Sequence, residues 1–230
     1  MINNTTIASR KLLLLSIPVS IIFALTGMDF IGFFTSTEEI YSRSLLNVLM
    51  GFFFTSVFLF IFPIMINRKL WKKSLSYFGT QWGNRKIGLI ITLFYLVLIP
   101  VFFINSKNQS MINTYPLTKV PLNTWSFFLF YELLYIVFYY VPYEFFFRGV
   151  LQLGLSKNWN KWYSILFVTG LTTVLHMTKP LPEIAGAAFA GILLGYIAEK
   201  TQSWFYVFLV HIITGVSTDI FCGLYYTGVL

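Results

Sequence analysis

The sequence predicts an all-α fold, a polytopic membrane helical bundle of about seven transmembrane helices. The chain of 230 residues is 57% hydrophobic and only 10% charged, and its mean hydropathy is +0.74. Soluble domains carry about 25% charged residues, so this composition excludes an ordinary soluble protein. Apolar runs of about 17 to 25 residues, the length that a helix needs to cross a bilayer, recur along the chain.

These apolar runs define the expected helices in order. They cover residues 12–28, 46–66, 87–104, 124–147, 161–177, 183–199 and 203–224. The first run, LLLLSIPVSIIFALTGM, follows Arg10 and Lys11 as a signal peptide would. It is longer than most signal cores and has no convincing small-x-small cleavage site after it, so we expect a helix of the mature protein.

The first three runs contain no acidic residue and no histidine. We interpret residues 1–120 as a three-helix membrane scaffold and residues 121–230 as the helical core where chemistry is expected, within one integrated membrane domain. The connection at residues 67–86 alternates aromatic residues with cations, in WKKSLSYFGTQWGNRK. This pattern is typical of an interfacial segment at the level of the lipid head groups.

The cations predict the orientation of the bundle. Twelve Lys and Arg residues fall in the amino-terminal segment and alternate connections, against four on the other side, which places the amino terminus in the cytoplasm and the carboxyl terminus outside. The net charge of +8 therefore indicates topology and attraction to the lipid bilayer, with no nucleic-acid partner. The twelve are Arg10, Lys11, Arg68, Lys69, Lys72, Lys73, Arg85, Lys86, Arg148, Lys157, Lys161 and Lys200, and the four are Arg43, Lys107, Lys119 and Lys179.

The fourth run ends in YEFFFRG, where Glu144 precedes Arg148 by four residues. On a helix the two side chains share a face and can form an ion pair. Pro142 removes one backbone donor just before them and permits a kink. Ionisable groups inside a membrane are costly and usually functional, although a structural ion pair is the alternative for these two residues alone.

The chain has two histidines, and both lie in apolar runs. His176 ends the fifth run and is followed by MTKPLPE, in which two prolines interrupt the helix before Glu183. Such a turn is stable at membrane depth only when it is buried in protein or lines a watery cavity. His211 lies in the last run. One histidine is more often a packing residue, but two of them with a carboxylate on a third helix favour hydrolytic chemistry.

The last run adds polar residues after His211. Thr214 and Gly215 follow within one turn, and Thr218 returns to the face of the histidine. Asp219 is about 80° away around the helix, so it either reaches a cavity two turns deeper or faces water.

Small residues in AGAAFAGILLGY predict close packing of the sixth helix. Gly191 and Gly195 have the spacing that lets two helix backbones approach, and Gly186 extends the stripe. The single cysteine, Cys222, excludes an internal disulfide and is expected to pack as a small apolar residue.

Four ordered segments, YEFFFRG, the His176 segment, KPLPE with AGAAFAGILLGY, and WFYVFLVH, together resemble the CPBP family of intramembrane proteases. This family includes the type II CAAX prenyl endopeptidases and bacteriocin-processing or immunity (Abi) proteins. The resemblance covers roughly residues 124–224. It implies that Glu144, Arg148, His176 and His211 are the catalytic residues of a hydrolase acting in intramembrane proteolysis.

Three positions depart from the family pattern. Tyr143 stands where the family has the first of two glutamates, which is proposed to activate the hydrolytic water, and Thr172 stands in place of a phenylalanine. Gly215 replaces an Asn or Asp that would steady the oxyanion of the tetrahedral intermediate. Deleting such a donor costs about 3 kcal/mol in other enzymes. We expect Thr214, Thr218 or Asp219 to compensate for the missing oxyanion donor at residue 215. These three residues, with Tyr143 and Glu183, are the expected supporting residues of the site.

The resulting hypothesis is a divergent peptidase acting on a peptide or protein substrate at the membrane. Glu144 is the expected general base, His176 and His211 hold the water or a metal, and Arg148 orients Glu144. No cofactor is firmly implied. A divalent metal such as zinc is an option, because two His and one Glu match a catalytic zinc ligand set.

Two other function classes compete with a peptidase. A noncatalytic family member acting as an immunity factor or membrane binding protein is motivated by Tyr143 and Gly215. A transporter or proton channel is the third, but it lacks support from repeats. The predicted boundaries also place His176 roughly 8 to 10 Å deeper than Glu144 from the cytoplasmic side, at 1.5 Å per residue. A shared site therefore requires a helix boundary different from the expected one.

Overall fold

The computed structural model describes residue 18 and residues 44–230 of the chain, and over these residues it is helical without strands. The predicted all-α bundle is confirmed. Five described helices are long and apolar enough to cross a membrane, and the predicted first helix, residues 12–28, lies outside the described residues apart from residue 18. The five are Leu45–Trp71, Arg85–Asn105, Trp125–Ser156, Leu181–Thr201 and Phe205–Tyr226.

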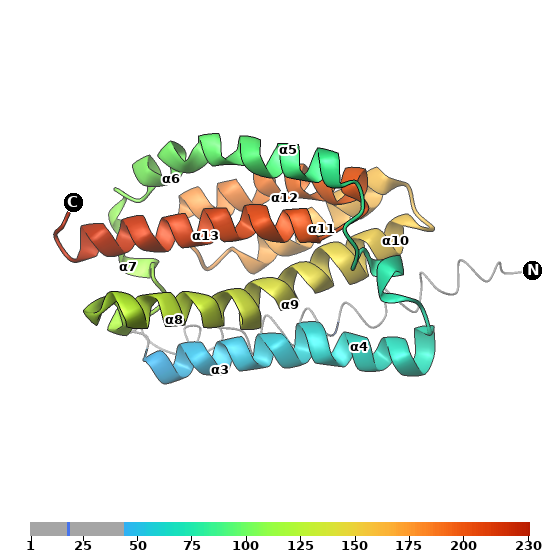
Figure 1. The fold of residues 1–230 in the computed structure, drawn as a ribbon, viewed down its shortest axis with the longest axis horizontal. Coiled ribbons are helices and arrows are strands. Elements are labelled where there is room, and N and C mark those ends of the chain that lie inside the picture. The colour runs from blue at the N-terminus through green and yellow to red at the C-terminus, as the bar shows by residue number, and fades with distance from the viewer. Residues whose placement is uncertain (1–17, 19–43) are drawn as a thin grey trace, which may run out of the picture.

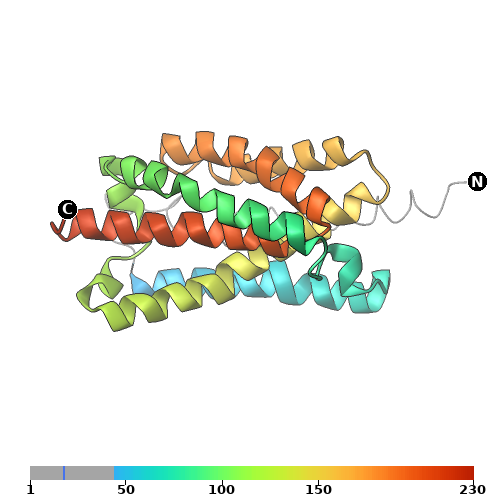
Figure 2. The ribbon, with the colours of Figure 1, turned by 45° about the horizontal axis from the view of Figure 1, so that its top comes forward.

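Helix α13 (Phe205–Tyr226) runs through the middle of the bundle (Figure 1). It contacts α5 (Arg85–Tyr95) and α6 (Ile99–Asn105) on one side and α9 (Val141–Glu144) on another. Figure 2 shows from a second direction that α12 (Leu181–Thr201) lies above α13. Helix α13 therefore packs against helices on several sides of the bundle.

The remaining helices cover this centre. Helix α3 packs against the fourth predicted span, and a short helix, α7, contacts α13. Helix α11 and helix α12 form the most extensive pair in the described structure. The bounds are α3 (Leu45–Ser56), α4 (Phe62–Ile66), α7 (Gln109–Thr114), α8 (Trp125–Tyr135), α10 (Gly154–Ser156) and α11 (Lys161–Leu175).

The fourth predicted span is one long helix in which two π-helical segments interrupt the α-helix. Wide π-helical turns at Ile136–Tyr140 and Phe145–Leu153 flank α9, and Pro142 lies in the first turn of α9. Because Pro142 has no N–H to donate, the regular ladder is interrupted there and the chain continues by π turns. These turns rotate the side chains after residue 140, Glu144 among them, relative to α8.

The expected boundary at residue 147 was wrong, because this helix continues to Ser156. Arg148 accordingly lies inside the bundle with 3% of its side chain exposed, and it does not belong to a cytoplasmic connection. Its charge is tolerated there because buried Glu144 and Gln152 contact it. At 1.5 Å per residue, Glu144 then lies about 18 Å from Ser156, against about 22 Å between His176 and Lys161, so about half of the expected depth mismatch remains.

Close packing of α11 on α12 agrees with the predicted small-residue stripe. A Cβ atom on Gly191 would lie 2.6 Å from Thr169, and one on Gly195 would lie 2.9 Å from Ile165. Both glycines are therefore required by the close approach of the two helices. Cys222 is buried and unbridged, as expected.

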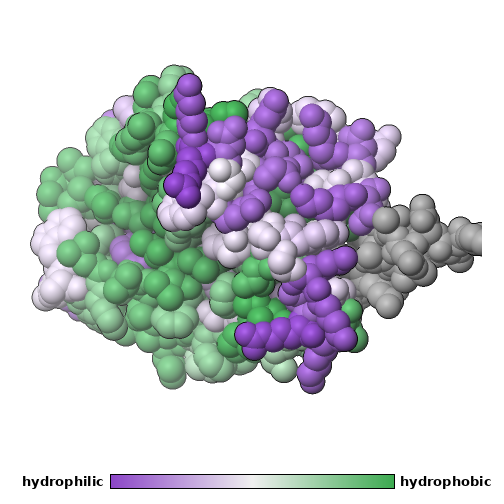
Figure 3. Space-filling model, turned by 45° about the vertical axis from the view of Figure 1, so that its right-hand side comes forward, coloured by the Kyte–Doolittle hydropathy of each residue, from purple (hydrophilic) through white to green (hydrophobic). Residues whose placement is uncertain are grey.

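The surface divides along the bundle axis (Figure 3). Hydrophilic side chains gather at one end, where Arg68, Lys72 and Arg85 are exposed. Large apolar side chains such as Phe94 and Phe189 are exposed on the flanks of the bundle. This division is the one expected of a multi-pass bundle that crosses a bilayer. The segment that follows the second span, predicted to be interfacial, lies at the hydrophilic end.

Candidate active site

A cavity of about 380 Å³ lies between α5, α6, α9, α11, α12 and α13. It is lined by all four residues that the sequence marks as catalytic, Glu144, Arg148, His176 and His211. Six of the seven departing or supporting positions also line it, and they are Tyr143, Thr172, Glu183, Thr214, Gly215 and Thr218. Asp219 is absent from this lining.

Glu144 and His211 are in direct contact. Oε1 of Glu144 lies 2.6 Å from Nδ1 of His211, and only 1% of the glutamate side chain is exposed. A carboxylate can only accept, so Nδ1 carries the proton and donates it to Glu144. This bond fixes the imidazole ring and leaves Nε2 as its nitrogen for the cavity, as a buried carboxylate does in catalytic triads.

Arg148 lies on the far side of Glu144 from the histidine. Its Nε is 3.8 Å from Oε2 of Glu144, so the predicted ion pair is present, though without a hydrogen bond. Its Nη1 donates to Oε1 of Gln152 at 3.0 Å, and the Gln152 amide donates to the carbonyl of Gly195 at 2.7 Å. Glu144 is thus backed by a buried chain that ties two helices together.

His176 ends α11 on the opposite side of the cavity. Its Nδ1 lies 2.7 Å from the backbone carbonyl of Thr172, which can only accept, so this nitrogen carries the proton. Its Nε2 is then an acceptor, and it lies 3.8 Å from Oε1 of Glu183. Thr172, where the family has phenylalanine, contributes its carbonyl to the orientation of the ring.

Glu183 is held by a tyrosine from a distant part of the chain. The hydroxyl of Tyr115, in the loop after α7, lies 2.8 Å from both carboxylate oxygens of Glu183. Burial, and then the facing carboxylate, raise the pKa of Tyr115 well above its usual value, so the phenol keeps its proton and donates. Glu183 remains 20% exposed in the cavity wall.

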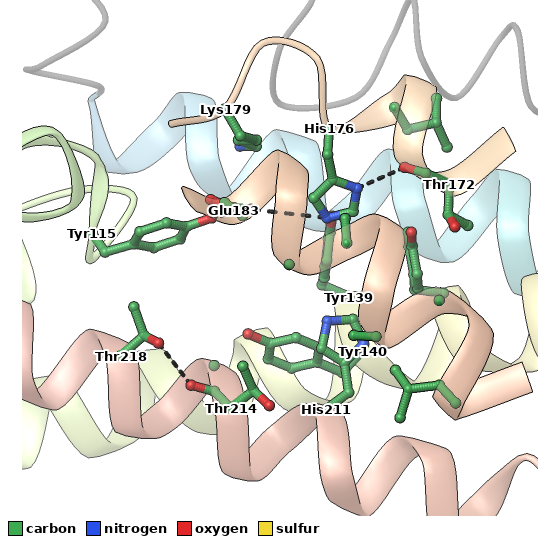
Figure 4. Close-up of a pocket in the computed structure, with 18 of the residues that line it drawn as sticks. Tyr115, Tyr139, Tyr140, Thr172, His176, Lys179, Glu183, His211, Thr214 and Thr218 are labelled. Atoms are coloured by element: carbon green, nitrogen blue, oxygen red, sulfur yellow. Dashed lines mark hydrogen bonds and ion pairs between the residues drawn. The ribbon is translucent and has the colours of Figure 1, made fainter. Parts of the chain in front are cut away.

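The two histidines face one another across the cavity from different helices (Figure 4). His176 and Glu183 belong to one wall, built by α11 and α12, whereas His211 belongs to the wall of α13. Tyr140 lies next to His211, with its ring centroid 4.8 Å from the imidazole. The predicted residues are therefore brought together as two separate polar groups in one cavity.

Gly215 makes room for the hydroxyl of Tyr140. A Cβ atom on Gly215 would lie 1.8 Å from that oxygen, so any side chain at this position would collide with it. The tyrosine hydroxyl thus occupies the space that an Asn or Asp at residue 215 would enter. Sequence reasoning missed Tyr140, although it stands one helical turn before Glu144.

The expected substitutes for residue 215 have other partners. The Thr214 hydroxyl is 2.9 Å from the hydroxyl of Tyr95, and the Thr218 hydroxyl donates to the backbone carbonyl of Thr214. Asp219 is completely buried beside Glu132 and lines a separate cavity of about 270 Å³. Of the two alternatives for Asp219, exposure to water was wrong, because the side chain is buried beside Glu132 of α8.

Tyr115 and Gln152 were also missed from the sequence. Their roles depend on contacts with residues 68 and 43 positions away, for which the local pattern gives no signal. Within the described part of the chain, no group of three or more His, Cys, Asp or Glu side chains is close enough together to hold a metal ion. Metal dependence through His176, His211 and Glu144 stays a prediction.

Comparison with known proteins agrees with the resemblance. Residues 124–217, which carry the π turns, both histidines and Glu183, match the family model described as type II CAAX prenyl endopeptidase Rce1-like. No curated protein and no solved structure gave a significant match. Over these residues the chain is similar to the type II CAAX prenyl endopeptidases of the Rce1-like family.

Proposed function

We propose that the chain is an intramembrane endopeptidase that hydrolyses a peptide bond of a membrane-associated substrate in the cavity between α11, α12 and α13. The observation that carries this proposal is the pair of histidines facing one another across about 380 Å³, one of them bonded to a buried carboxylate. Binding pockets for small ligands have volumes of about 300 to 1,000 Å³, so a short peptide segment fits.

The wall formed by α9 and α13 suits the carbonyl side of the reaction. The Glu144 carboxylate stabilises a protonated His211, and Nε2–H then donates toward the scissile carbonyl oxygen. The Tyr140 hydroxyl, beside the same ring, is a second donor for the negative charge that develops there. Preorganised donors of this kind each contribute about 10² to 10³ in kcat.

In this arrangement Glu144 is a positioning residue. One of its oxygens is bonded to His211, and the other is buried, facing Arg148. The sequence prediction that Glu144 is the general base receives less support from this geometry than a role in holding the imidazole. Arg148 faces the second carboxylate oxygen and is proposed to orient Glu144, as the sequence predicts.

The substrate is proposed to reach the cavity from the bilayer. The lining includes aromatic residues of α5 and α6 together with a small-residue face of α12, where nothing lies within 4 Å of a Cβ atom placed on Gly186. Apolar walls of this kind suit a peptide that carries a lipid or an apolar flank. A prenylated CAAX-type peptide is the substrate class that the description of the matched family favours, and a bacteriocin-like peptide is the alternative that the sequence resemblance implies.

The test is cleavage of a quenched fluorescent prenylated peptide by the purified chain in liposomes. We expect cleavage by the wild type and a loss of at least about 10² in kcat for His176→Ala and for His211→Ala. Gly170→Ala is the matched control, because nothing lies within 4 Å of the added Cβ and the residue is not in the cavity wall. Folded variants that cleave as fast as the wild type would contradict the proposal, and absence of wild-type cleavage would favour the noncatalytic alternative.

A further inference from the structure

We propose that Glu183 is the catalytic carboxylate that removes the proton from the attacking water, with His176 as the second group that binds this water. The inference rests on the proposed peptidase function and identifies a further catalytic residue for it. It moves the acid–base chemistry to the wall of α11 and α12, opposite the buried Glu144.

The first observation concerns access to water. Glu144 and Glu183 are the carboxylates that line the cavity among the described residues, and their exposure differs. Glu144 is 1% exposed and its Oε1 is bonded to His211, whereas Glu183 is 20% exposed. A general base must reach the proton that it removes, within about 2.6 to 3.2 Å of the oxygen that carries it. Glu183 meets this condition, and Glu144 does not.

The second observation is the distance between Glu183 and His176. Oε1 and Nε2 are 3.8 Å apart, which is too long for a direct hydrogen bond. One water oxygen at about 2.8 Å from each atom bridges them. Because Nδ1 of His176 donates to the Thr172 carbonyl, Nε2 and the carboxylate both accept from that water. The pair therefore orients the lone pairs of the water away from itself and into the cavity.

The third observation is the support behind Glu183. The Tyr115 hydroxyl is 2.8 Å from both carboxylate oxygens, which fixes the carboxylate plane from the side away from His176. A purely structural reading assigns Glu183 to the first turn of α12, where an acidic residue stabilises the helix dipole. That reading explains a carboxylate at this position. It does not explain its orientation into the cavity or a dedicated donor from a loop 68 residues away.

The chemical step balances with water as the only co-reactant. The water oxygen attacks the scissile carbonyl carbon, a C–O bond forms, and the water proton passes to Glu183. The negative charge on the carbonyl oxygen is met by His211 and Tyr140 from the opposite wall. The C–N bond then breaks, and Glu183 returns the proton to the leaving amine, which releases a carboxylic acid and an amine.

The experiment compares Glu183→Gln with Glu144→Gln in the liposome cleavage assay over a range of pH. We expect Glu183→Gln to lower kcat by about 10² to 10⁴ with little change in KM, and the acidic limb of the pH profile to disappear from its residual activity. Glu144→Gln also lowers kcat, through His211, but its acidic limb remains. Glu183→Asp is expected to restore part of the activity. Lys200→Gln, which removes an exposed charge at the other end of the same helix and outside the cavity, is the control.

Tyr115→Phe tests the support of the carboxylate. Without the Tyr115 hydroxyl the carboxylate loses the donor that orients it, so kcat should fall with little change in KM while the protein stays folded. Folded Glu183→Gln protein with kcat within about threefold of the wild type would overturn the assignment and leave the peptidase function intact. An acidic limb lost in Glu144→Gln and kept in Glu183→Gln would overturn it equally. Absence of cleavage by the wild type would overturn both the assignment and the function.

Discussion

Adding a single methyl group at Gly215 should test where the Tyr140 hydroxyl lies. The Cβ atom of Gly215→Ala would be 1.8 Å from this oxygen and 2.6 Å from the adjacent ring carbon. Ordinary contact begins at about 3.4 Å, so the tyrosine must retreat by roughly 1.6 Å. Overpacking of this kind costs about 1 to 3 kcal/mol. Because the ring also packs 4.8 Å from His211, the retreat displaces a proposed donor of the active site.

Two measurements check this expectation. Thermal unfolding in detergent micelles should show a lower midpoint for Gly215→Ala, by about 2 to 4 °C for each kcal/mol in a chain of this size. The cleavage assay should show kcat reduced by about 10² to 10³, the value of one donor to an oxyanion. Tyr140→Phe should lose comparable activity with a smaller loss of stability, because it removes the oxygen without adding an atom.

The double variant Tyr140→Phe with Gly215→Ala separates the two effects. Its stability should be higher than the sum of the single changes predicts, since the 1.8 Å contact is gone and the 2.6 Å contact remains. Contacting residues show coupling energies of about 0.5 to 3 kcal/mol. Gly170→Ala, where nothing lies within 4 Å, should be neutral or stabilising and serves as the control. A Gly215→Ala protein as stable and active as the wild type would refute the reasoning.

Three further outcomes are expected. Arg148→Met should destabilise the protein by about 3 to 5 kcal/mol in thermal unfolding, because the Glu144 carboxylate then stays buried without its cation, and adding Glu144→Gln should recover much of this loss. Gly191→Leu should lower the unfolding midpoint and the cleavage rate together, since a Cβ atom there already meets Thr169 at 2.6 Å. Burial lowers the pKa of Lys119 from 10.5 to about 8, so between these pH values the unfolded chain binds a proton that the folded chain does not. Stability should therefore rise with pH from about 8 to about 10.5, and Lys119→Met should abolish the rise.

Local features of the chain account for what the sequence predicts well. Hydropathy identifies the spans because a bilayer forces every backbone group to bond within its own helix. The Glu144–Arg148 pair follows from their spacing of one turn, and the close approach at Gly191 follows from the glycine pattern. The extension of the fourth helix was missed because a charged residue at the end of an apolar run suggests a loop. Only the structure shows that Arg148 is buried and bonded to Gln152.

Contacts between distant segments could not be predicted. Nothing near Glu183 in the sequence points to Tyr115, and nothing near Gly215 indicates that Tyr140 fills its space. Spacing along a helix gives the face on which a side chain lies, but the residue that it meets depends on helix packing. The π turns on either side of Pro142 add a further rotation that no regular 3.6-residue period contains.

The two walls of the cavity differ in how firmly they are held, and this difference bears on the chemistry. His211 is fixed through Glu144 and Arg148 to Gln152, a fully buried chain that reaches the backbone of α12. His176 ends a short helix just before a proline turn, and it is oriented by one backbone carbonyl. A fixed set of donors suits the developing oxyanion, because its stabilisation depends on preorganisation. An imidazole held by one bond can adjust as the water that it binds attacks, while the Tyr115 hydroxyl keeps Glu183 aligned for the proton transfer.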